Sequence, residues 1–362
     1  MKKIALLALS LAFIFTLTAC SPNANVSNQT DTNSSSSDTP ADNTGSANTP
    51  KKIAMIMGQM NMDFFVYIAA GAEKAADELG VDLTVWNAAS DIVKVGELVD
   101  LAAEQGFDAI ITPDSTGSAK SAIEAATGLG IPVVGYDSLA FPELFNATVA
   151  SDSFEMGQQC ANLAIEDAKQ QGKDSVHFVI AYNPTSQSCI TRHDGMLKAL
   201  EDSGLNYTFE EIGQPVNDIS EFLTLWDDML AHSAEDAIDY ALGCDSFASI
   251  GCMSACQAAG RTDIKVFGID DETDQLNGLL VDESDRVYWG TIAQQPAEIG
   301  RLCVEAALAA LEGNNLGTQY ADASIVTPEN VVSFKETRDA NNEAVKPYIE
   351  ACLLYTSPSP RD

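Results

Sequence analysis

The stretch Ile53-Ala54-Met55-Ile56-Met57 is an unbroken apolar run of strand length. Residues 64–79 after it carry apolar side chains at helical spacing, and Gly80 is a typical residue for ending a helix. Residues 81–86 again have the composition of a strand. Because the first run is apolar throughout rather than alternating, we expect both faces of its strand to be covered. A strand, a helix and a second strand in this order indicate an α/β fold with parallel strands.

The same alternation continues to about residue 312. We expect further strands at residues 109–112, 131–136, 176–181, 207–212, 238–242, 264–269 and 288–292. We expect helices at residues 92–104, 118–127, 154–171, 190–203, 222–232, 247–259 and 296–312. These are more βα units than one compact open sheet holds comfortably, so the sequence predicts two similar doubly wound parallel-sheet lobes.

The chain begins with the features of an exported protein. Met1-Lys2-Lys3 precedes an apolar run at residues 4–17, which is the pattern of a signal peptide at residues 1–19 and is too short for a membrane span. The segment Leu17-Thr18-Ala19-Cys20 resembles the lipobox of bacterial lipoproteins. We therefore expect lipidation at Cys20 and a lipid anchor that holds the protein on the extracytoplasmic face of the cell membrane. The alternative is a secreted protein with a chance cysteine at its cleavage site.

The two segments that flank the central region are polar. Residues 20–50 follow the cleavage site with Ser, Thr, Asn, Asp, Ala and Pro and almost no large apolar side chain, which predicts a disordered tether after the lipidated cysteine. Residues 352–362 resemble the translation of a transposon adapter used in shotgun sequencing. We therefore predict that this segment is a sequencing artefact, and the alternative is a genuine polar tail.

The composition restricts the class of protein. Residues 51–351 suffice for one large or two medium domains, and an apolar fraction of 46% is typical of a globular core. A net charge of −34 argues against nucleic acid as a partner, because phosphates would be repelled. Cys252 and Cys256 share a predicted helix face, but no histidine lies near them in the sequence. We therefore expect neither a metal site nor a cofactor.

In open α/β sheets, ligands bind outside the carboxyl ends of the strands. The residues that follow the predicted strands include Phe64, Phe65, Asp137, Arg192, Asp245, Asp270 and Gln294. Carboxylates accept hydrogen bonds from adjacent hydroxyls, a guanidinium donates in a fixed fork, and an amide does both. An aromatic face covers the apolar face of a sugar ring. This set predicts a site for a neutral or cationic polyhydroxylated ligand.

Each of these residues also has a purely structural alternative. Asp137, Asp245 and Asp270 follow strands, where aspartate is often a turn or N-cap residue. At least one of the two phenylalanines is expected to belong to the core between helix and sheet. Arg192 could be a solvated helix residue.

Four stretches resemble one family. They are Asn61-Met62-Asp63-Phe64-Phe65 with the following Gly71-Ala72-Glu73-Lys74-Ala75-Ala76, Gly130-Ile131-Pro132-Val133-Val134 with Asp137, Ala150-Ser151-Asp152 with Arg192-His193-Asp194-Gly195-Met196, and Gly268-Ile269-Asp270 with Thr291-Ile292-Ala293-Gln294-Gln295-Pro296. In this order they resemble the type I periplasmic sugar-binding proteins of the ribose- and galactose-binding group. These proteins are solute receptors of ABC transporters, and the resemblance covers residue 51 to about residue 333.

The resemblance implies a hinge of three crossovers, near residues 150–151, 294–295 and 321. The first lobe would then comprise residues 51–150 and 295–321, and the second lobe residues 151–294 and 322–351. Phe64 or Phe65 would stack on the sugar, and Asp270 would hold its anomeric region. The remaining hydrogen bonds to the sugar would come from Asp137, Arg192, Asp245 and Gln294.

Three positions depart from the family's pattern. Ribose binders have arginine where this chain has Ser138, and asparagine where it has Asp245. Met62 replaces a polar residue in the opening loop. The resemblance therefore points to the family more strongly than to ribose.

The function that we expect is a solute-binding lipoprotein, a monomer, that delivers a sugar to the permease of an ABC importer. The alternatives are a ligand receptor for a membrane sensor and a nucleoside-binding lipoprotein. An enzyme is not expected, because the sequence has neither a Gly-x-Ser-x-Gly elbow nor a His-Glu-x-x-His motif.

Overall fold

The computed structural model of the chain describes residues 49–234 and 237–355, with side chains as far as residue 349. The predicted signal peptide, Cys20, most of the tether and residues 356–362 lie outside the described residues.

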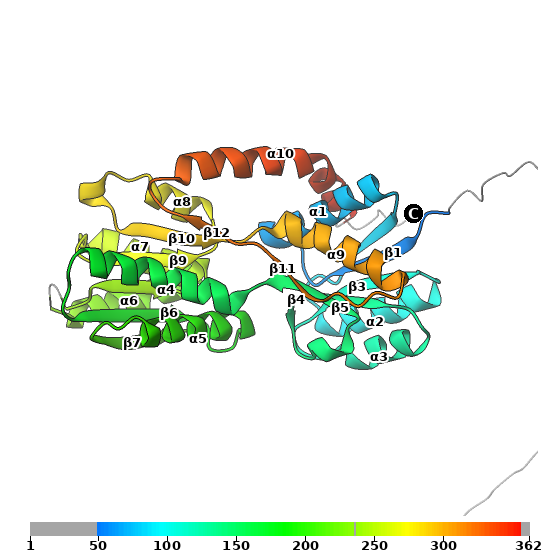
Figure 1. Cartoon of the computed structure of the whole chain (residues 1–362), viewed down its shortest axis with the longest axis horizontal. Helices are drawn as coiled ribbons and strands as arrows, with labels where there is room; N and C mark the ends of the chain where they lie inside the picture. The colour runs from blue at the N-terminus through cyan, green and yellow to red at the C-terminus, as the bar shows by residue number, and fades with distance from the viewer. Residues whose placement is uncertain (1–48, 235–236, 356–362) are drawn as a thin grey trace, which may run out of the picture. The chain divides into compact units, whose positions relative to one another are not determined.

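The first lobe is built on a sheet of six parallel strands in the order β11-β5-β4-β3-β1-β2 (Figure 1). The strands are β1 (Lys52–Met57), β2 (Asp82–Asn87), β3 (Ala109–Asp114), β4 (Val133–Leu139), β5 (Ala147–Ser151) and β11 (Gly317–Ala321). The helices are α1 (Asp63–Leu79), α2 (Ile92–Glu104), α3 (Lys120–Gly128) and α9 (Pro296–Leu311), and a 3-10 turn, η1 (Pro142–Leu144), precedes β5. All strand pairs in this lobe run parallel, as the sequence predicts.

The apolar run of β1 shows why both faces of this sheet are covered. Ile53, Met55 and Met57 belong to one buried cluster, which α1 and α9 complete. Ala54 and Ile56 point the other way, into a second cluster that α2 and α3 complete. Successive side chains of a strand point to opposite faces, so an unbroken apolar strand must be covered by helices on both sides.

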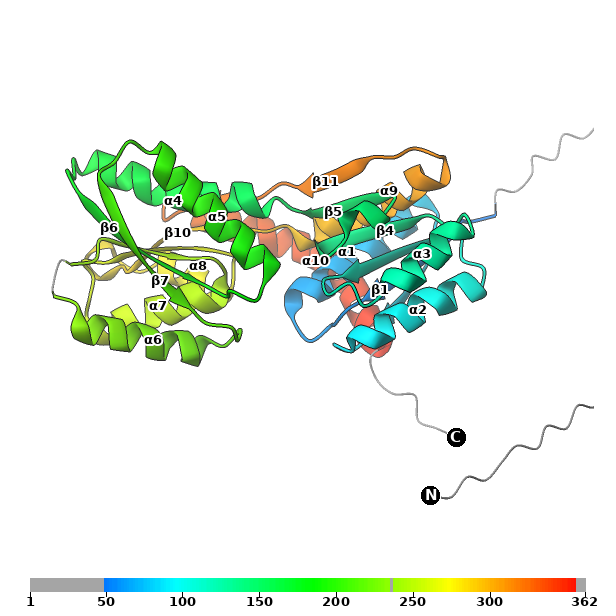
Figure 2. The ribbon, with the colours of Figure 1, turned by 90° about the horizontal axis from the view of Figure 1, so that it is seen from below.

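The second lobe repeats this arrangement with the strand order β12-β10-β9-β8-β6-β7. Figure 2 shows α4 and α5 on one side of this sheet and α6 and α7 on the other. The strands are β6 (Val176–Tyr182), β7 (Tyr207–Gly213), β8 (Tyr240–Gly243), β9 (Lys265–Ile269), β10 (Tyr288–Ala293) and β12 (Ser324–Val326), of which β12 alone among the described strands runs antiparallel to its neighbour. The helices are α4 (Ser153–Gln170), α5 (Gln187–Asp202), α6 (Ile219–His232), α7 (Ser246–Ala259) and α8 (Thr273–Leu279), and a 3-10 turn, η2 (Glu283–Asp285), precedes β10.

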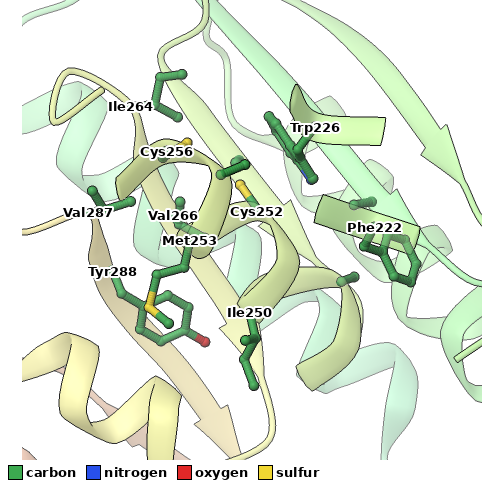
Figure 3. Close-up of a cluster of buried hydrophobic side chains, with 14 of the residues drawn as sticks. Phe222, Trp226, Ile250, Cys252, Met253, Cys256, Ile264, Val266, Val287 and Tyr288 are labelled. Carbon is green, nitrogen blue, oxygen red and sulfur yellow. The ribbon is translucent and has the colours of Figure 1, made fainter. Parts of the chain in front are cut away.

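The core of the second lobe also lies on both faces of its sheet. On one face α4 and α5 enclose a cluster that includes Cys160, Cys189 and Cys244. On the other face α6 and α7 enclose a second cluster, and α7 packs against β8 and β9 (Figure 3). Trp226 of α6 and Cys252 of α7 are among the buried side chains of that cluster. The buried cysteines thus act as small apolar residues of the core.

The chain crosses between the two sheets three times. It passes from β5 to α4, from β10 to α9, and from β11 to β12. The predicted fold class, two similar doubly wound lobes joined by three crossovers, is confirmed.

The last helix, α10 (Val331–Tyr355), is not predicted by the sequence. In its first turn, Val331 and Phe334 pack in the core of the second lobe. Farther along, α10 packs against α1 of the first lobe, and Ile349 packs against the core of that lobe. Figure 1 shows α10 running from one lobe to the other. The helix therefore contacts both lobes.

Candidate functional site

A cleft of about 1010 Å³ lies between the lobes. The strands of both sheets have their carboxyl ends at this cleft. All seven residues predicted from the sequence line it: Phe64, Phe65, Asp137, Arg192, Asp245, Asp270 and Gln294. Three come from the first lobe and the others from the second lobe and its connection to α9. The topology brings these side chains together, since parallel strands end at the same edge of a sheet.

Asp270 is the most firmly held of the site residues. Its backbone has a φ of 81°, in the left-handed region that is uncommon for residues other than glycine. One carboxylate oxygen accepts a hydrogen bond from Gln294 Nε2 at 2.6 Å, and the other accepts from the backbone N–H of Ser246 at 3.0 Å. The backbone is fixed as well, because Thr291 Oγ1 donates to the Asp270 carbonyl oxygen at 2.5 Å. Such strain often occurs at ligand sites, where the surrounding structure stabilises it.

Arg192 is buried, with 6% of its surface exposed. Its Nη1 donates to the Cys244 carbonyl oxygen at 3.0 Å and lies 4.0 Å from an oxygen of Asp270. Burial lowers the pKa of Arg192, but the charges around it, first Asp270, outweigh that effect and the net shift is upward. The Nε atom is buried without a hydrogen-bond partner in the described part of the chain. The guanidinium thus remains charged and has a donor to spare, so the sequence alternative of a solvated residue is wrong.

The position of Arg192 depends on two glycines where α4 and α5 cross. A Cβ at Gly157 would lie 2.0 Å from the Arg192 carbonyl oxygen, and a Cβ at Gly195 would lie 2.1 Å from the Phe154 carbonyl oxygen. The helices can approach this closely only because neither position carries a side chain. The same reciprocal contact occurs in the first lobe, where Gly300 of α9 meets the backbone of α1.

Asp245 has a structural role beside its place in the cleft. It is the N-cap of α7, and its Oδ1 accepts from the backbone N–H of Ala248 at 2.8 Å. The thiol of Cys189 lies 3.3 Å from its Oδ2 and donates to it. Burial raises the pKa of the Asp245 carboxyl. Asp245 therefore caps a helix and also lines the cleft.

Asp137 lies in β4, two residues before the end of the strand, and has a φ of 60°. Both lobes therefore present an aspartate with left-handed backbone to the cleft. Burial also raises the pKa of Asp137, and the nearby charge of Arg192 opposes this shift. Phe64 and Phe65 meet edge to face, with ring centroids 5.3 Å apart. Both rings are half-buried, and both pack against the core while lining the cleft.

Several residues that line the cleft are not among the seven predicted from the sequence. Asp271 lies next to Asp270, and α10 adds Arg338, Asn341 and Asn342. Burial raises the pKa of Asp271 to about 6, and Arg338 opposes the shift. Asp271 could have been included because it too follows a predicted strand. Arg338 could not, since no strand or helix pattern marks its surroundings.

Within the part of the chain that the structure describes, no cluster of His, Cys, Asp and Glu side chains has the arrangement of a metal site. The six cysteines whose side chains the structure describes are free and buried, and burial raises the pKa of Cys189 to about 12. Thiols of this kind are poor ligands and poor nucleophiles at neutral pH. Among the described helices none is long and apolar enough to cross a membrane.

The family model described as a periplasmic binding protein domain matches residues 53–315. The chain belongs to this family. The ribose import binding protein of Bacillus subtilis is 27% identical over 87% of this chain and 95% of its own length. The corresponding protein of Escherichia coli is 28% identical over 76% of this chain and 91% of its own length. These relatives and the family are binding proteins of transport systems.

Solved structures agree with the fold of this periplasmic binding protein. A solute-binding protein of an ABC transporter from Agrobacterium vitis, solved with bound allitol, superposes with a TM-score of 0.67. It is 19% identical and covers 80% of this chain and 99% of its own. At this identity the likeness shows the two-lobed fold alone.

Proposed function

We propose that this protein is an extracytoplasmic solute-binding lipoprotein that captures a sugar between its two lobes and delivers it to an ABC importer. The observation that supports this proposal most directly is the composition of the cleft. The seven predicted residues, which supply one buried guanidinium with a free donor, three carboxylates, an amide and two phenylalanines, all line this one space. This set can hydrogen-bond adjacent hydroxyls and cover an apolar ring face.

The proposal assigns a role to each cleft residue. Asp137, Arg192, Asp245 and Gln294 bind hydroxyls, Asp270 holds the anomeric region, and Phe64 or Phe65 stacks on the ring. The functional lobes comprise residues 51–150 with 295–321 and residues 151–294 with 322–351, and the protein acts as a monomer. Relatives named for ribose import and a neighbour with bound allitol make pentoses and polyols the first candidates.

A ligand screen by thermal shift tests this function. Pentoses, hexoses, polyols, amino sugars and nucleosides are each added to the protein, and the midpoint of thermal unfolding is measured. A ligand that binds only the folded state at 100 times its Kd stabilises the fold by about 2.7 kcal/mol. We expect a clear rise in Tm with at least one sugar or polyol. A rise with a nucleoside alone would replace the sugar proposal with the nucleoside alternative.

The membrane anchor is a separate part of the proposal and rests on Cys20. Cells that express the full chain with Cys20→Ala are fractionated beside cells that express the native chain. We expect the native protein in the membrane fraction and the variant in the soluble fraction. Equal membrane association of both would contradict lipidation at this residue.

A further inference from the structure

The helix α10 presents one face to both α1 and the cleft. Arg338, Asn341, Asn342 and Val345 line the cleft, and their spacing of three, four and seven residues places them on one side of the helix. Val345 is 4% exposed. The opposite side carries exposed residues such as Glu343, which pairs with the exposed Lys346 on the same helix. One side of α10 therefore faces the cleft and the other faces solvent, although its sequence is mostly polar.

Contacts at two levels show how α10 lies on α1. Arg338 is close enough to Tyr67 of α1 to influence the pKa of that tyrosine. Ten residues farther along each helix, the nearby carboxylate of Asp77 raises the pKa of Tyr348. Since equal steps along α1 and α10 separate the two contacts, the helices run side by side in the same direction. Ile349 packs against the core of the first lobe, and Val345, one turn before it, is buried. We call this contact with the first lobe the seat of α10.

The same helix also holds the loop that carries Asp270. Arg338 Nη1 donates to the Asp271 carbonyl oxygen at 2.8 Å and lies 3.4 Å from the Asp271 carboxylate. Asp271 directly follows Asp270, whose left-handed backbone needs support from its surroundings. On the other side of this loop, Gln275 Nε2 donates to the Ile269 carbonyl oxygen at 2.8 Å. Arg338 and Gln275 thus fix the residues that flank Asp270.

We propose that Arg338 is a positioning residue for the ligand site, and that α10 couples the seat on α1 of the first lobe to the Asp270 loop of the second lobe. The three crossovers connect the lobes through the backbone. α10 adds a noncovalent connection, which can transmit a change at one lobe to the loop of the other. Arg338 acts through Asp271 and does not need to contact the sugar. The part of this proposal that concerns affinity rests on the proposed sugar-binding function.

Hydrogen exchange tests the positioning role without any ligand. Arg338→Ala, Arg338→Lys and Lys346→Ala are made in the full chain, and amide exchange is followed by mass spectrometry in peptides that cover residues 268–276. A charge-assisted hydrogen bond is lost in Arg338→Ala, so we expect exchange of this loop to become about tenfold faster. Arg338→Lys should restore most of the protection, and Lys346→Ala should match the native protein. Native exchange in Arg338→Ala would overturn the proposal.

The coupling across the lobes needs a second pair of variants. Val345→Asp places a charge in the seat on α1, whereas Val332→Asp adds the same charge at a position that is 58% exposed near the start of α10. We expect faster exchange in peptides of residues 268–276 for Val345→Asp and not for Val332→Asp. If Val345→Asp does not fold, Val345→Ala gives the same comparison in milder form. Faster exchange confined to α10 would contradict the coupling.

A binding arm connects the result to affinity. D-ribose and allitol are titrated by calorimetry into the native protein, Arg338→Ala and Arg338→Lys. Where the native protein binds one of these probes, we expect about tenfold weaker binding for Arg338→Ala and partial rescue by Arg338→Lys. Equal affinity of all three proteins would reject Arg338 as a positioning residue. If the native protein binds neither probe, the exchange experiments alone decide, and the failure belongs to the choice of sugar.

Discussion

Gly157 of α4 lies directly against the backbone of Arg192 on α5, with room for a hydrogen atom and no more. A Cβ at position 157 would lie 2.0 Å from the Arg192 carbonyl oxygen, a distance that no real pair of atoms of this kind adopts. The helix α5, which carries the buried guanidinium, can therefore lie this close to α4 only because position 157 has no side chain. This relationship links helix packing in the second lobe to the geometry of the cleft.

Gly157→Ala should separate the two helices and move Arg192. Forcing an extra carbon into a packed contact costs about 1–3 kcal/mol, and more where backbone opposes it. We expect a lower free energy of unfolding, measured by urea denaturation. Gly128→Ala is the control, because a Cβ at that position meets nothing within 4 Å. Equal stability of both variants would show that the contact is relaxed in solution.

Arg192→Ala should abolish tight binding of whichever sugar raises the Tm. The change removes the only guanidinium that contacts Asp270 among the described residues and leaves the Cys244 carbonyl oxygen without its partner. Truncating one member of a buried charge pair costs about 2–5 kcal/mol, so affinity should fall at least tenfold. Calorimetry with Arg286→Ala as control tests this, since Arg286 lies over Trp289 outside the cleft. Unchanged affinity would remove Arg192 from the site.

Gln294→Glu should place a second carboxylate against Asp270. The amide nitrogen that it replaces lies 2.6 Å from Asp270 Oδ1, so repulsion takes the place of a hydrogen bond. We expect a loss of about 1–3 kcal/mol of stability at pH 7 and partial recovery in acid, when one of the two groups binds a proton. Thermal unfolding at pH 7 and at acid pH measures the loss and the recovery of stability. Gln257→Glu on the exposed side of α7 is the control. A variant as stable as the control at pH 7 would mean that the two side chains separate freely.

Asp271 should make stability depend on pH in a defined direction. Burial raises its pKa from 3.8 to about 6, so the folded state binds a proton more readily than the unfolded state does. The contribution of this group to stability is therefore present below about pH 4 and is lost as the pH rises to about 6. The full effect is on the order of 2–3 kcal/mol before screening by solvent.

Asp271→Asn tests this dependence. Relative to the native protein, we expect the variant to gain stability between pH 4 and pH 6.5, measured by urea denaturation at several pH values. Asp174→Asn at an exposed position is the control and should follow the native curve. Parallel curves for native protein and Asp271→Asn would show that Asp271 is not destabilised by burial.

The first lobe shows how far sequence reasoning extends. The apolar run at β1 predicts a strand covered on both faces, and the structure places its side chains in two separate clusters. The strand-end rule also places Asp137, Arg192 and Asp270 at one cleft before any coordinates are known. Both predictions rest on the period of strands and helices, which is a local property of the chain.

Some features could not be predicted in this way. From the sequence, Asp245 could be either a helix cap or a ligand-binding residue. Only the distance from its carboxylate to the backbone N–H of Ala248 shows that it caps α7. The small strands β11 and β12 have partners that lie far away in sequence, so no local pattern marks them. Helix α10 has few apolar residues, and its position depends on its contact with α1 of the first lobe.

The sequence by itself determined the two-lobed α/β fold, the family and the residues at the strand ends, because spacing of apolar side chains and placement after a strand are written along the chain. Only the tertiary structure decided that Gly157 sets the position of Arg192 and that Arg338 supports the Asp270 loop. These relationships join residues that are 35 and 68 positions apart in sequence, counted from Gly157 to Arg192 and from Asp270 to Arg338. They arise from close packing between helices and across lobes, where distance in space and not along the chain sets the energy.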